Sequence, residues 1–201
     1  MLNSSELAKK ISLGKNADEN GLSIIPAPQV TDIEESGESS VTLRLGRWLV
    51  ALRQSSQTFF DVADDKVELR AEARAAKFYF IQFGNKYVLH PNRFVLGSTL
   101  EWIKLPATLG AYITGKSTWA RRGLIIETAA GIHPGFSGCL TLELTNVGEV
   151  PIIIRSGMKI CQIFPHNVSG GEYKSHGPLT GRRRPYLGAP SDDPLYRSLA
   201  A

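Results

Sequence analysis

The amino-acid sequence predicts an all-β sandwich or barrel-like fold with a short N-terminal helix and a C-terminal arm. Three observations support this prediction. Short apolar segments recur along the chain between Gly, Pro and Asn turns, which is the pattern of antiparallel β proteins. Several of these segments alternate apolar and polar residues. From Ser169 onward the chain is rich in Gly, Pro, Ser and Arg and has no periodicity. We therefore expect one β domain over residues 1–168 and a flexible arm over residues 169–201.

The composition is that of a soluble globular protein. The 201 residues are 42% hydrophobic and 21% charged, and no apolar run approaches the roughly 20 residues that a membrane span needs. The N-terminal sequence lacks the apolar segment of a signal peptide, and the two cysteines, Cys139 and Cys161, belong to no CxxC pair. We expect a cytoplasmic location with both thiols reduced. The net charge of +4 is compatible with binding of nucleic acid, with binding of small polyphosphates, or with a role in solubility alone.

The N-terminal residues predict one helix between polar loops. Residues 4–11 place Leu7 and Ile11 four positions apart on one face, and a serine at position 4 or 5 is a suitable N-cap. The polar, Gly- and Asn-rich residues 14–21 predict a loop. The acidic residues 32–38 predict a second, solvated loop.

Strand candidates occupy most of the remaining chain. Residues 41–46 alternate apolar and polar side chains and continue into residues 48–52, which indicates a half-buried strand. Residues 55–74 are ambiguous, because strand-like and helix-like patterns overlap there. Further strand candidates, each bounded by turn residues, are residues 22–26, 78–81, 87–89, 94–99, 123–128, 139–144, 151–155 and 158–164.

A central turn follows residues 107–113 and contains a literal match to the phosphate-binding pattern GxxxxGK[ST], at residues 110–117. Such a loop needs a following helix whose backbone amides converge on the phosphates. Residues 118–123 offer only about one helical turn before a glycine. We therefore exclude a P-loop.

The central turn nevertheless concentrates groups that recognise phosphate. Lys116, Ser117, Thr118 and Arg121 supply one ammonium, two hydroxyls and one guanidinium within a few residues. Composition alone favours a basic surface turn. The two hydroxyls placed between two cations favour a phosphate-binding role.

A single carboxylate, Glu143, interrupts the apolar strand candidate at residues 139–144. Because neighbouring side chains of a strand point to opposite faces, Glu143 shares its face with Thr141 and Thr145 and not with the leucines beside it. The period alone predicts an ordinary outward-facing glutamate. If the Thr-Glu-Thr face lines a pocket, the carboxylate is a candidate proton carrier.

The histidine in the turn Gly-Ile-His-Pro-Gly, His133, is more often structural than functional in such a position. The HxE and PCxxC pattern of zinc deaminases does not occur in the sequence. Zinc also needs partners at ligand spacing, which His133 lacks. We expect no zinc site and no metal ligands in the chain.

Three blocks of the sequence resemble the dCTP deaminase family, which belongs to the trimeric dUTPase-like superfamily. They are GKSTWARRGL at residues 115–124, TAAGIHPGFSG at residues 128–138 and LTLELTN at residues 140–146. Further likeness, in the same order, lies at residues 40–46, 94–101 and 157–162. The resemblance implies a distorted β-barrel of the dUTPase-like type, a homotrimer, and active sites built between subunits.

The resemblance also implies roles for individual residues. Glu143 matches the glutamate that moves protons while water attacks C4 of cytosine, and Ser117 matches a serine that holds this water together with the carbonyl of Ala129. The family contacts its substrate triphosphate, which carries Mg²⁺, through residues that match Lys116, Thr118, Arg121 and Gln162. No zinc is used.

The chain departs from the family pattern at His133, at Gly131, where some members carry a basic residue, and in the C-terminal arm. His133 stands where relatives often carry an aspartate near the sugar, and where enzymes that hydrolyse dUTP use that acid to activate water. In the arm, Tyr186 and Gly188 remain from a longer motif that closes over the nucleotide, but its lysine and glutamine do not. We expect the arm to be mobile without ligand, with residues 182–184 meeting phosphate oxygens and Tyr186 covering the base or sugar.

The expected function is hydrolytic deamination of dCTP to dUTP and ammonia. The first alternative is a dUTP diphosphatase, or an enzyme that couples both reactions and releases dUMP. The second alternative is a nucleotide-binding trimer without turnover. Nucleic-acid binding through Arg182, Arg183 and Arg184 is the weakest of these hypotheses, and a membrane partner is not expected.

Overall fold

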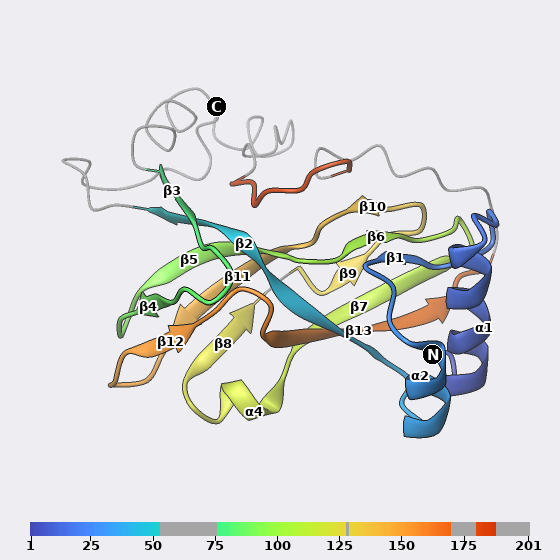
Figure 1. The fold of residues 1–201 in the computed structure, drawn as a ribbon, viewed down its shortest axis with the longest axis horizontal. Helices are drawn as coiled ribbons and strands as arrows, with labels where there is room; N and C mark the ends of the chain where they lie inside the picture. The colour runs from blue at the N-terminus through green and yellow to red at the C-terminus, as the bar shows by residue number, and fades with distance from the viewer. Residues whose placement is uncertain (53–75, 128, 170–179, 188–201) are drawn as a thin grey trace, which may run out of the picture.

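The computed structural model describes residues 1–52, 76–127, 129–169 and 180–187, and its fold is mainly β (Figure 1). Every strand pairing in these residues is antiparallel. The predicted fold class is therefore confirmed. The strands are β1 (Ser23–Ile25), β2 (Val41–Leu52), β3 (Ala76–Phe80), β4 (Tyr87–Leu89), β5 (Phe94–Thr99), β6 (Trp102–Lys104), β7 (Leu109–Gly115), β8 (Leu124–Glu127), β9 (Gly131–Ile132), β10 (Ser137–Gly138), β11 (Thr141–Asn146), β12 (Ile152–Ile154) and β13 (Lys159–Asn167).

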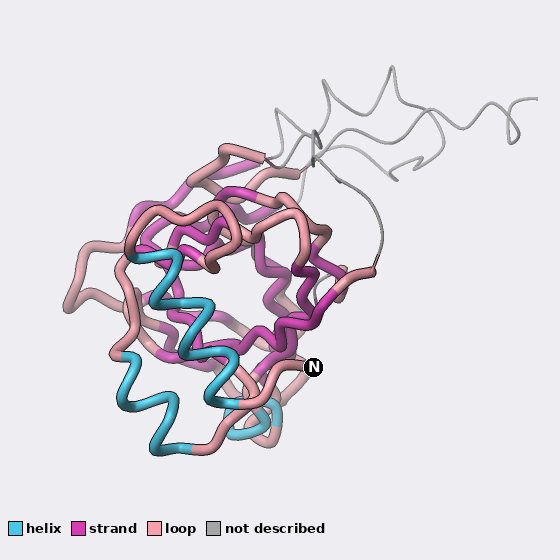
Figure 2. Tube along the Cα trace, turned by 90° about the vertical axis from the view of Figure 1, so that its right-hand side faces the viewer, coloured by secondary structure: helices cyan, strands magenta, loops and turns pink. Residues whose placement is uncertain are grey.

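The strands form one large curled sheet and two small ones. The large sheet has the order β8-β11-β5-β2-β13-β7-β9, and β3 also pairs with β2. Its end strands, β8 and β9, do not pair with each other in the described residues, so the sheet is a curled half-barrel (Figure 2). The small sheets are β1-β6-β10 and β12-β4.

The long strand β2 joins the two parts of the large sheet. Its first residues pair with β13, and its later residues pair with β5 and β3. The register with β5 shifts between Leu45 and Leu49. Gly46 lies at this irregularity, where a Cβ atom would stand 2.9 Å from the carbonyl oxygens of Ser98 and Thr99. A larger residue would therefore push the two strands apart.

The predicted N-terminal helix is present as α1 (Ser4–Lys15), which extends one turn beyond the predicted end. Its N-cap is Asn3 and not Ser4 or Ser5. The Asn3 side chain accepts a bond from the backbone N–H of Glu6, and the Glu6 carboxylate accepts one from the backbone N–H of Asn3. This reciprocal pair is a capping box. Leu7 and Ile11 are buried as predicted, and α1 lies across one end of the curled sheet (Figure 2).

The acidic residues predicted as a loop form a second short helix, α2 (Val30–Ser36). This part of the loop prediction was wrong. Ile33 is the buried residue of α2, and α2 packs against α1. Gly37 ends the helix in the left-handed conformation at φ 66°, where glycine has no steric penalty. The burial of Ile33 therefore favours a helix here, although the acidic side chains resemble those of a solvated loop.

The predicted strands are mostly present with shifted ends. The candidate at residues 139–144 corresponds to β11, which begins at Thr141 and ends at Asn146. The strands β6, β7, β9 and β10 were not predicted. Segments as short as β6, β9 and β10 show little periodicity, and residues 107–113 were interpreted only as the approach to the central turn. The ambiguous residues 55–74 lie outside the described residues.

The hydrophobic core lies inside the curl of the large sheet and under α1. It takes alternate residues from each strand, such as Leu142 and Leu144 of β11, which are fully buried. Among the described residues, no helix combines the length and the apolar composition of a membrane span.

Candidate functional site

Glu143 lies on the outer face of the large sheet. In β11 the half-buried residues Thr141, Glu143 and Thr145 alternate with fully buried leucines and Asn146. This confirms the face predicted from the period of two. The neighbour of Glu143 on β5 is Leu96, which in turn pairs with Val50 of β2. The carboxylate is therefore held at one position of a continuous sheet and stays half-buried there.

The central turn is a single helical turn. β7 ends at Gly115, Lys116 is the N-cap, and α4 (Ser117–Ala120) follows. The backbone N–H groups of Trp119 and Ala120 both donate to the Lys116 carbonyl, at 2.9 and 3.2 Å. The brevity of this helix agrees with the exclusion of a P-loop.

The polar side chains of the central turn face outward. Ser117, Thr118 and Arg121 are exposed, while the indole N–H of Trp119 donates to the carbonyl of Lys159 at 2.7 Å. Trp119 thus fastens the turn to β13. The hydroxyls and the guanidinium remain accessible to an anionic ligand.

Two of the predicted substrate-binding residues are brought together by strands that are distant in the sequence. Gln162 of β13 pairs with Thr42 of β2 on one side and with Thr114 of β7 on the other. The ammonium of Lys116 donates to the Thr42 hydroxyl at 3.4 Å. Side chains of paired residues share one face of a sheet. Thr42 therefore connects Lys116 to Gln162.

Two further predicted residues lie beside the short strand β9. Ala129 and His133 are exposed and lie in the segments around β9. The carbonyl of His133 accepts the backbone N–H of Phe136 at 3.2 Å, which closes the predicted turn. Within the described residues, no hydrogen bond or ion pair joins Glu143 to Ser117. Within one chain, the predicted site residues therefore lie in separate groups.

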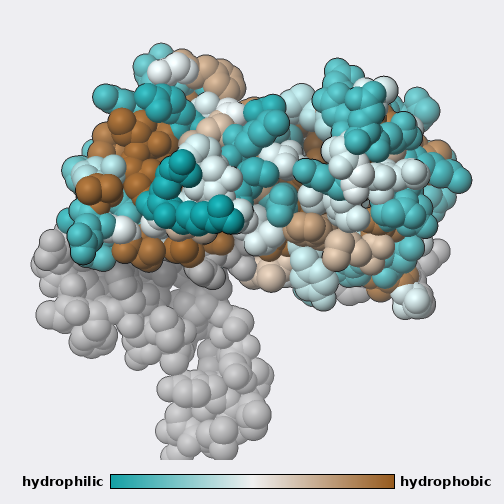
Figure 3. Space-filling view, turned by 90° about the horizontal axis from the view of Figure 1, so that it is seen from below, coloured by the Kyte–Doolittle hydropathy of each residue, from teal (hydrophilic) through white to brown (hydrophobic). Residues whose placement is uncertain are grey.

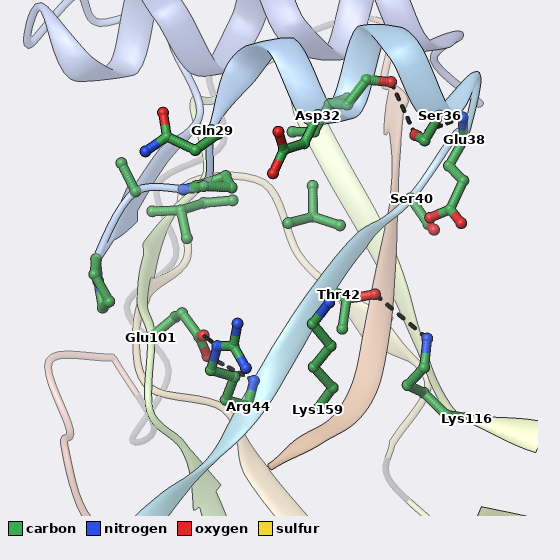
Figure 4. A pocket seen from close by; sticks show the side chains of 16 residues that line it. Gln29, Asp32, Ser36, Glu38, Ser40, Thr42, Arg44, Glu101, Lys116 and Lys159 are labelled. Carbon is green, nitrogen blue, oxygen red and sulfur yellow. Dashed lines mark hydrogen bonds and ion pairs between the residues drawn. The ribbon is translucent and has the colours of Figure 1, made fainter. Parts of the chain in front are cut away.

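A cavity of about 670 Å³ lies between α2 and the first half of β2 (Figure 4). Three cations, Arg44, Lys116 and Lys159, line it together with Thr42 and the carboxylate of Glu101. Figure 4 shows Arg44 beside Glu101 on one side of the cavity and Lys116 beside Thr42 on the other. Of these residues, only Lys116 had been assigned a role from the sequence.

Glu101 is the buried acid that the sequence reasoning missed. It is only 5% exposed, and its Oε2 atom accepts the backbone N–H of Arg44 at 2.8 Å. The Nε atom of Arg44 lies 4.0 Å from Oε1. Burial raises the pKa of the Glu101 carboxyl, and the bond from Arg44 opposes that shift. A carboxylate that directly follows a predicted strand was the available signal.

The described part of the arm is docked on the domain. The backbone N–H of Gly181 donates to the carbonyl of Ser137, and the N–H of Cys139 donates to the carbonyl of Arg182. The guanidinium of Arg182 lies 3.7 Å from the ring centroid of Tyr186. Residues 180–187 therefore contact the domain through backbone hydrogen bonds, and the mobility of the arm without ligand stays a prediction. The rest of the arm, apart from Ser169, lies outside the described residues.

The donor groups of the candidate site suit an anion better than a bare metal ion. Cations and hydroxyls surround the central turn, and the described residues contain no group of three or more His, Cys, Asp or Glu side chains arranged to hold a metal. Magnesium prefers oxygen ligands and often binds through substrate phosphates.

Comparison with known proteins gives four findings. A family model described as dCTP deaminase-like matches residues 2–167. The "dCTP deaminase, dUMP-forming" of Leifsonia xyli subsp. xyli is 39% identical over 140 residues, or 69% of this chain and 67% of that protein. The protein of the same name from Corynebacterium glutamicum (strain R) is 37% identical over 164 residues, or 81% and 82% of the two chains. A solved structure of 2′-deoxycytidine 5′-triphosphate deaminase from Agrobacterium tumefaciens has a TM-score of 0.49 at 23% identity, covering 63% of this chain and 37% of that one.

A curled antiparallel sheet with a half-buried glutamate and a cationic, hydroxyl-rich turn defines a mainly β protein with exposed cations and hydroxyls on one turn. The match of the family model to residues 2–167 is more specific. The chain belongs to the dCTP deaminase-like family.

Proposed function

We propose that the chain deaminates dCTP hydrolytically and that dUMP is its final product. One observation carries this proposal. In a chain of the dCTP deaminase-like family, Glu143 is a half-buried carboxylate on the outer face of a rigid sheet. A single carboxylate so placed can accept a proton and return it, which is the proton transfer that deamination requires.

The reaction proceeds by addition of water and loss of ammonia. Water held by the Ser117 hydroxyl and the Ala129 carbonyl attacks C4 of cytosine, and Glu143 accepts its proton and delivers it to N3. The tetrahedral carbon then expels the amino group, which takes the second proton of the water through Glu143 and leaves as ammonia. One dCTP and one water give one dUTP and one ammonia.

The triphosphate lies at the Lys116 end of the site. The Lys116 ammonium and the amide of Gln162, connected through Thr42, bind phosphate oxygens, and the exposed Thr118 and Arg121 side chains complete the contacts. Charge-assisted bonds from ammonium and guanidinium to phosphate are among the stronger hydrogen bonds in proteins. Mg²⁺ chelated by the triphosphate neutralises part of its charge.

We assign dUMP as the final product because the relatives of this chain are named dUMP-forming dCTP deaminases. The sequence alone favoured release of dUTP and kept dUMP as an alternative. In the second step, water attacks the α-phosphorus of dUTP and pyrophosphate leaves. His133 is our candidate for activating that water, because an imidazole accepts a proton near neutral pH.

The complete site forms between the subunits of a homotrimer. The described chain offers Ser117, Thr118 and Arg121 on an exposed turn and Glu143 on a strand to which that turn is not bonded. An arrangement in which one subunit supplies the turn and its neighbour supplies the glutamate brings both to one substrate.

A product assay tests this function. Purified protein incubated with dCTP and Mg²⁺ should release ammonia, and chromatography should show dUMP as the accumulating nucleotide. Glu143→Gln should lower the rate about 10²- to 10⁴-fold, the usual contribution of general acid–base catalysis. The matched control is Glu149→Gln, which changes an exposed glutamate in the turn after β11 and should leave the rate unchanged.

Three other outcomes are informative. Accumulation of dUTP without dUMP would restrict the activity to deamination. Tight dCTP binding in a calorimeter without any product would identify a non-catalytic nucleotide-binding protein. Full activity of the Glu143→Gln variant would contradict the assigned proton carrier.

A further inference from the structure

A second, smaller cavity of about 400 Å³ opens where the docked arm segment meets β2, β3 and β6. We call it the aromatic pocket and define it by six of its lining residues: Arg47, Trp48, Phe80, Trp102, Cys139 and Arg183. It shares no residue with the cavity that holds Lys116. Its size is within the range of small-ligand sites, which lies at about 300–1,000 Å³.

Aromatic rings and guanidinium groups alternate around the aromatic pocket. The Trp48 and Phe80 ring centroids are 4.8 Å apart, and the Arg47 guanidinium lies 4.3 Å from the Phe80 ring. From the docked arm, Arg183 lies 5.0 Å from the Trp102 ring. The adjacent Arg184 covers Trp48 at 4.1 Å. Segments distant in the sequence thus converge on one set of rings.

Within the part of the chain that the structure describes, no acidic side chain forms an ion pair with the guanidinium groups of the pocket. Among the described residues, the one ion pair joins Arg44 to Glu101, and the Nε atom of Arg47 is buried without any hydrogen-bond partner. Burial raises the pKa of the Cys139 thiol, so the wall beside Arg183 carries a neutral group at pH 7. The pocket therefore combines planar apolar surface with uncompensated positive charge.

We propose that the aromatic pocket is an accessory nucleotide-binding site, in which a base stacks on the tryptophan rings and Arg47 and Arg183 bind its phosphate. Stacking on aromatic rings accepts any base, since every base has a π face. A cation–π contact at an exposed site is weaker than a charge-assisted bond to phosphate. Arg183 therefore gains when it exchanges the Trp102 ring for a phosphate oxygen.

The aromatic pocket opens on the sheet face that carries Glu143. Val50 pairs with Leu96, which pairs with Glu143, and Ser98, which lines the pocket, pairs with Thr141. Successive side chains on one strand face are two residues apart. The pocket floor is therefore one row of side chains from the glutamate, and an occupant is a neighbour of the proposed catalytic site without occupying it.

Calorimetry with the full chain tests the proposal, with Glu143→Gln as the background so that dCTP is not consumed. Titration with dCTP should reveal two binding sites per chain. Adding Arg183→Gln should weaken one of them at least tenfold and leave the other unchanged, and Trp102→Leu should do the same. The matched control is Arg155→Gln, an exposed arginine outside the pocket, which should alter neither site.

A second titration identifies the source of the nucleotide unit. Fluorescence anisotropy of labelled (dT)10 should show binding that Arg183→Gln abolishes if the pocket takes a nucleotide of single-stranded DNA. If Arg183→Gln removes the second dCTP site and has no effect on (dT)10 binding, the ligand of the pocket is a free nucleotide. The proposal is overturned if Arg183→Gln, whose exposed position ensures folding, changes neither dCTP stoichiometry nor (dT)10 binding. Because these readouts measure binding, their failure is distinct from a failure to deaminate dCTP.

Discussion

At the scale of single residues, Glu143 and Glu101 show how differently two acids of one fold can be buried. Glu143 lies in β11, and Glu101 lies in the bend between β5 and β6. Glu143 is half-buried on the outer face of β11. Glu101 is 5% exposed and depends on a backbone N–H supplied by Arg44, 57 positions earlier in the chain. The period of two predicted the face of Glu143. No local pattern predicts the environment of Glu101, because its partner is brought near only by the pairing of β2.

Glu101 makes the stability of the protein depend on pH in a stated direction. Burial raises its folded pKa above the ordinary value of 4.5, so the folded protein binds this proton more tightly than the unfolded chain does. The contribution of Glu101 to the free energy of unfolding therefore falls as pH rises from 4.5 through the raised pKa.

The Glu101→Gln variant checks this direction. Its amide oxygen still accepts the Arg44 N–H but carries no charge, so this part of the pH dependence should disappear. Urea unfolding at a series of pH values between 4.5 and 7 measures the effect in both proteins. If the free energy of unfolding of the variant depends on pH as strongly as that of the wild type, the role assigned to Glu101 is wrong.

At the scale of elements, the sequence predicted long segments better than short ones. The helix α1 and the strand β2 have enough residues to show their periods. The helix α2 was missed because its acidic residues resemble a solvated loop, and only the burial of Ile33 against the rest of the fold decides the matter. The cavity beside α2 was unpredictable for the same reason. The cationic turn could be predicted, since its donors are adjacent in sequence.

Asn146 fixes the end of β11 to the small β4–β12 sheet. Its side chain is fully buried and donates to the carbonyls of Leu89 and Val150, both at 2.9 Å. It also accepts the backbone N–H of Gly148 at 2.9 Å. One side chain therefore satisfies three backbone groups.

The Asn146→Ala variant should be destabilised by about 2–4 kcal/mol, because buried backbone groups lose their partners. The midpoint of urea denaturation, compared at constant m-value, measures this loss. Glu149→Ala is the matched control, since Glu149 lies in the turn after β11 and is exposed. It should change stability by less than about 0.5 kcal/mol. Equal effects of both substitutions would refute the role of Asn146.

At the scale of the whole molecule, one end of the protomer exposes apolar surface. Figure 3 shows this surface gathered at the end where β4 and β12 lie. Its residues include the cross-strand pair Val88 and Ile153, together with Val147 and Val150. Exposed apolar patches commonly mark protein–protein contacts. This patch supports the proposal that the protein self-associates.

Subunit mixing tests whether the active sites lie between the subunits of a trimer. Ser117→Ala and Glu143→Gln proteins should each be nearly inactive. If one subunit supplies Ser117 and its neighbour supplies Glu143, mixed trimers contain some sites in which both residues are intact. In a cyclic trimer assembled at random from equal amounts, the subunit that supplies Ser117 is intact at that residue with a probability of one half. Its neighbour is intact at Glu143 with the same probability, so about a quarter of the sites are intact. Co-expression of the two variants with different tags should therefore restore about a quarter of the wild-type rate of ammonia release. If the mixture stays as inactive as its parents while sedimentation shows mixed trimers, both residues act within one chain.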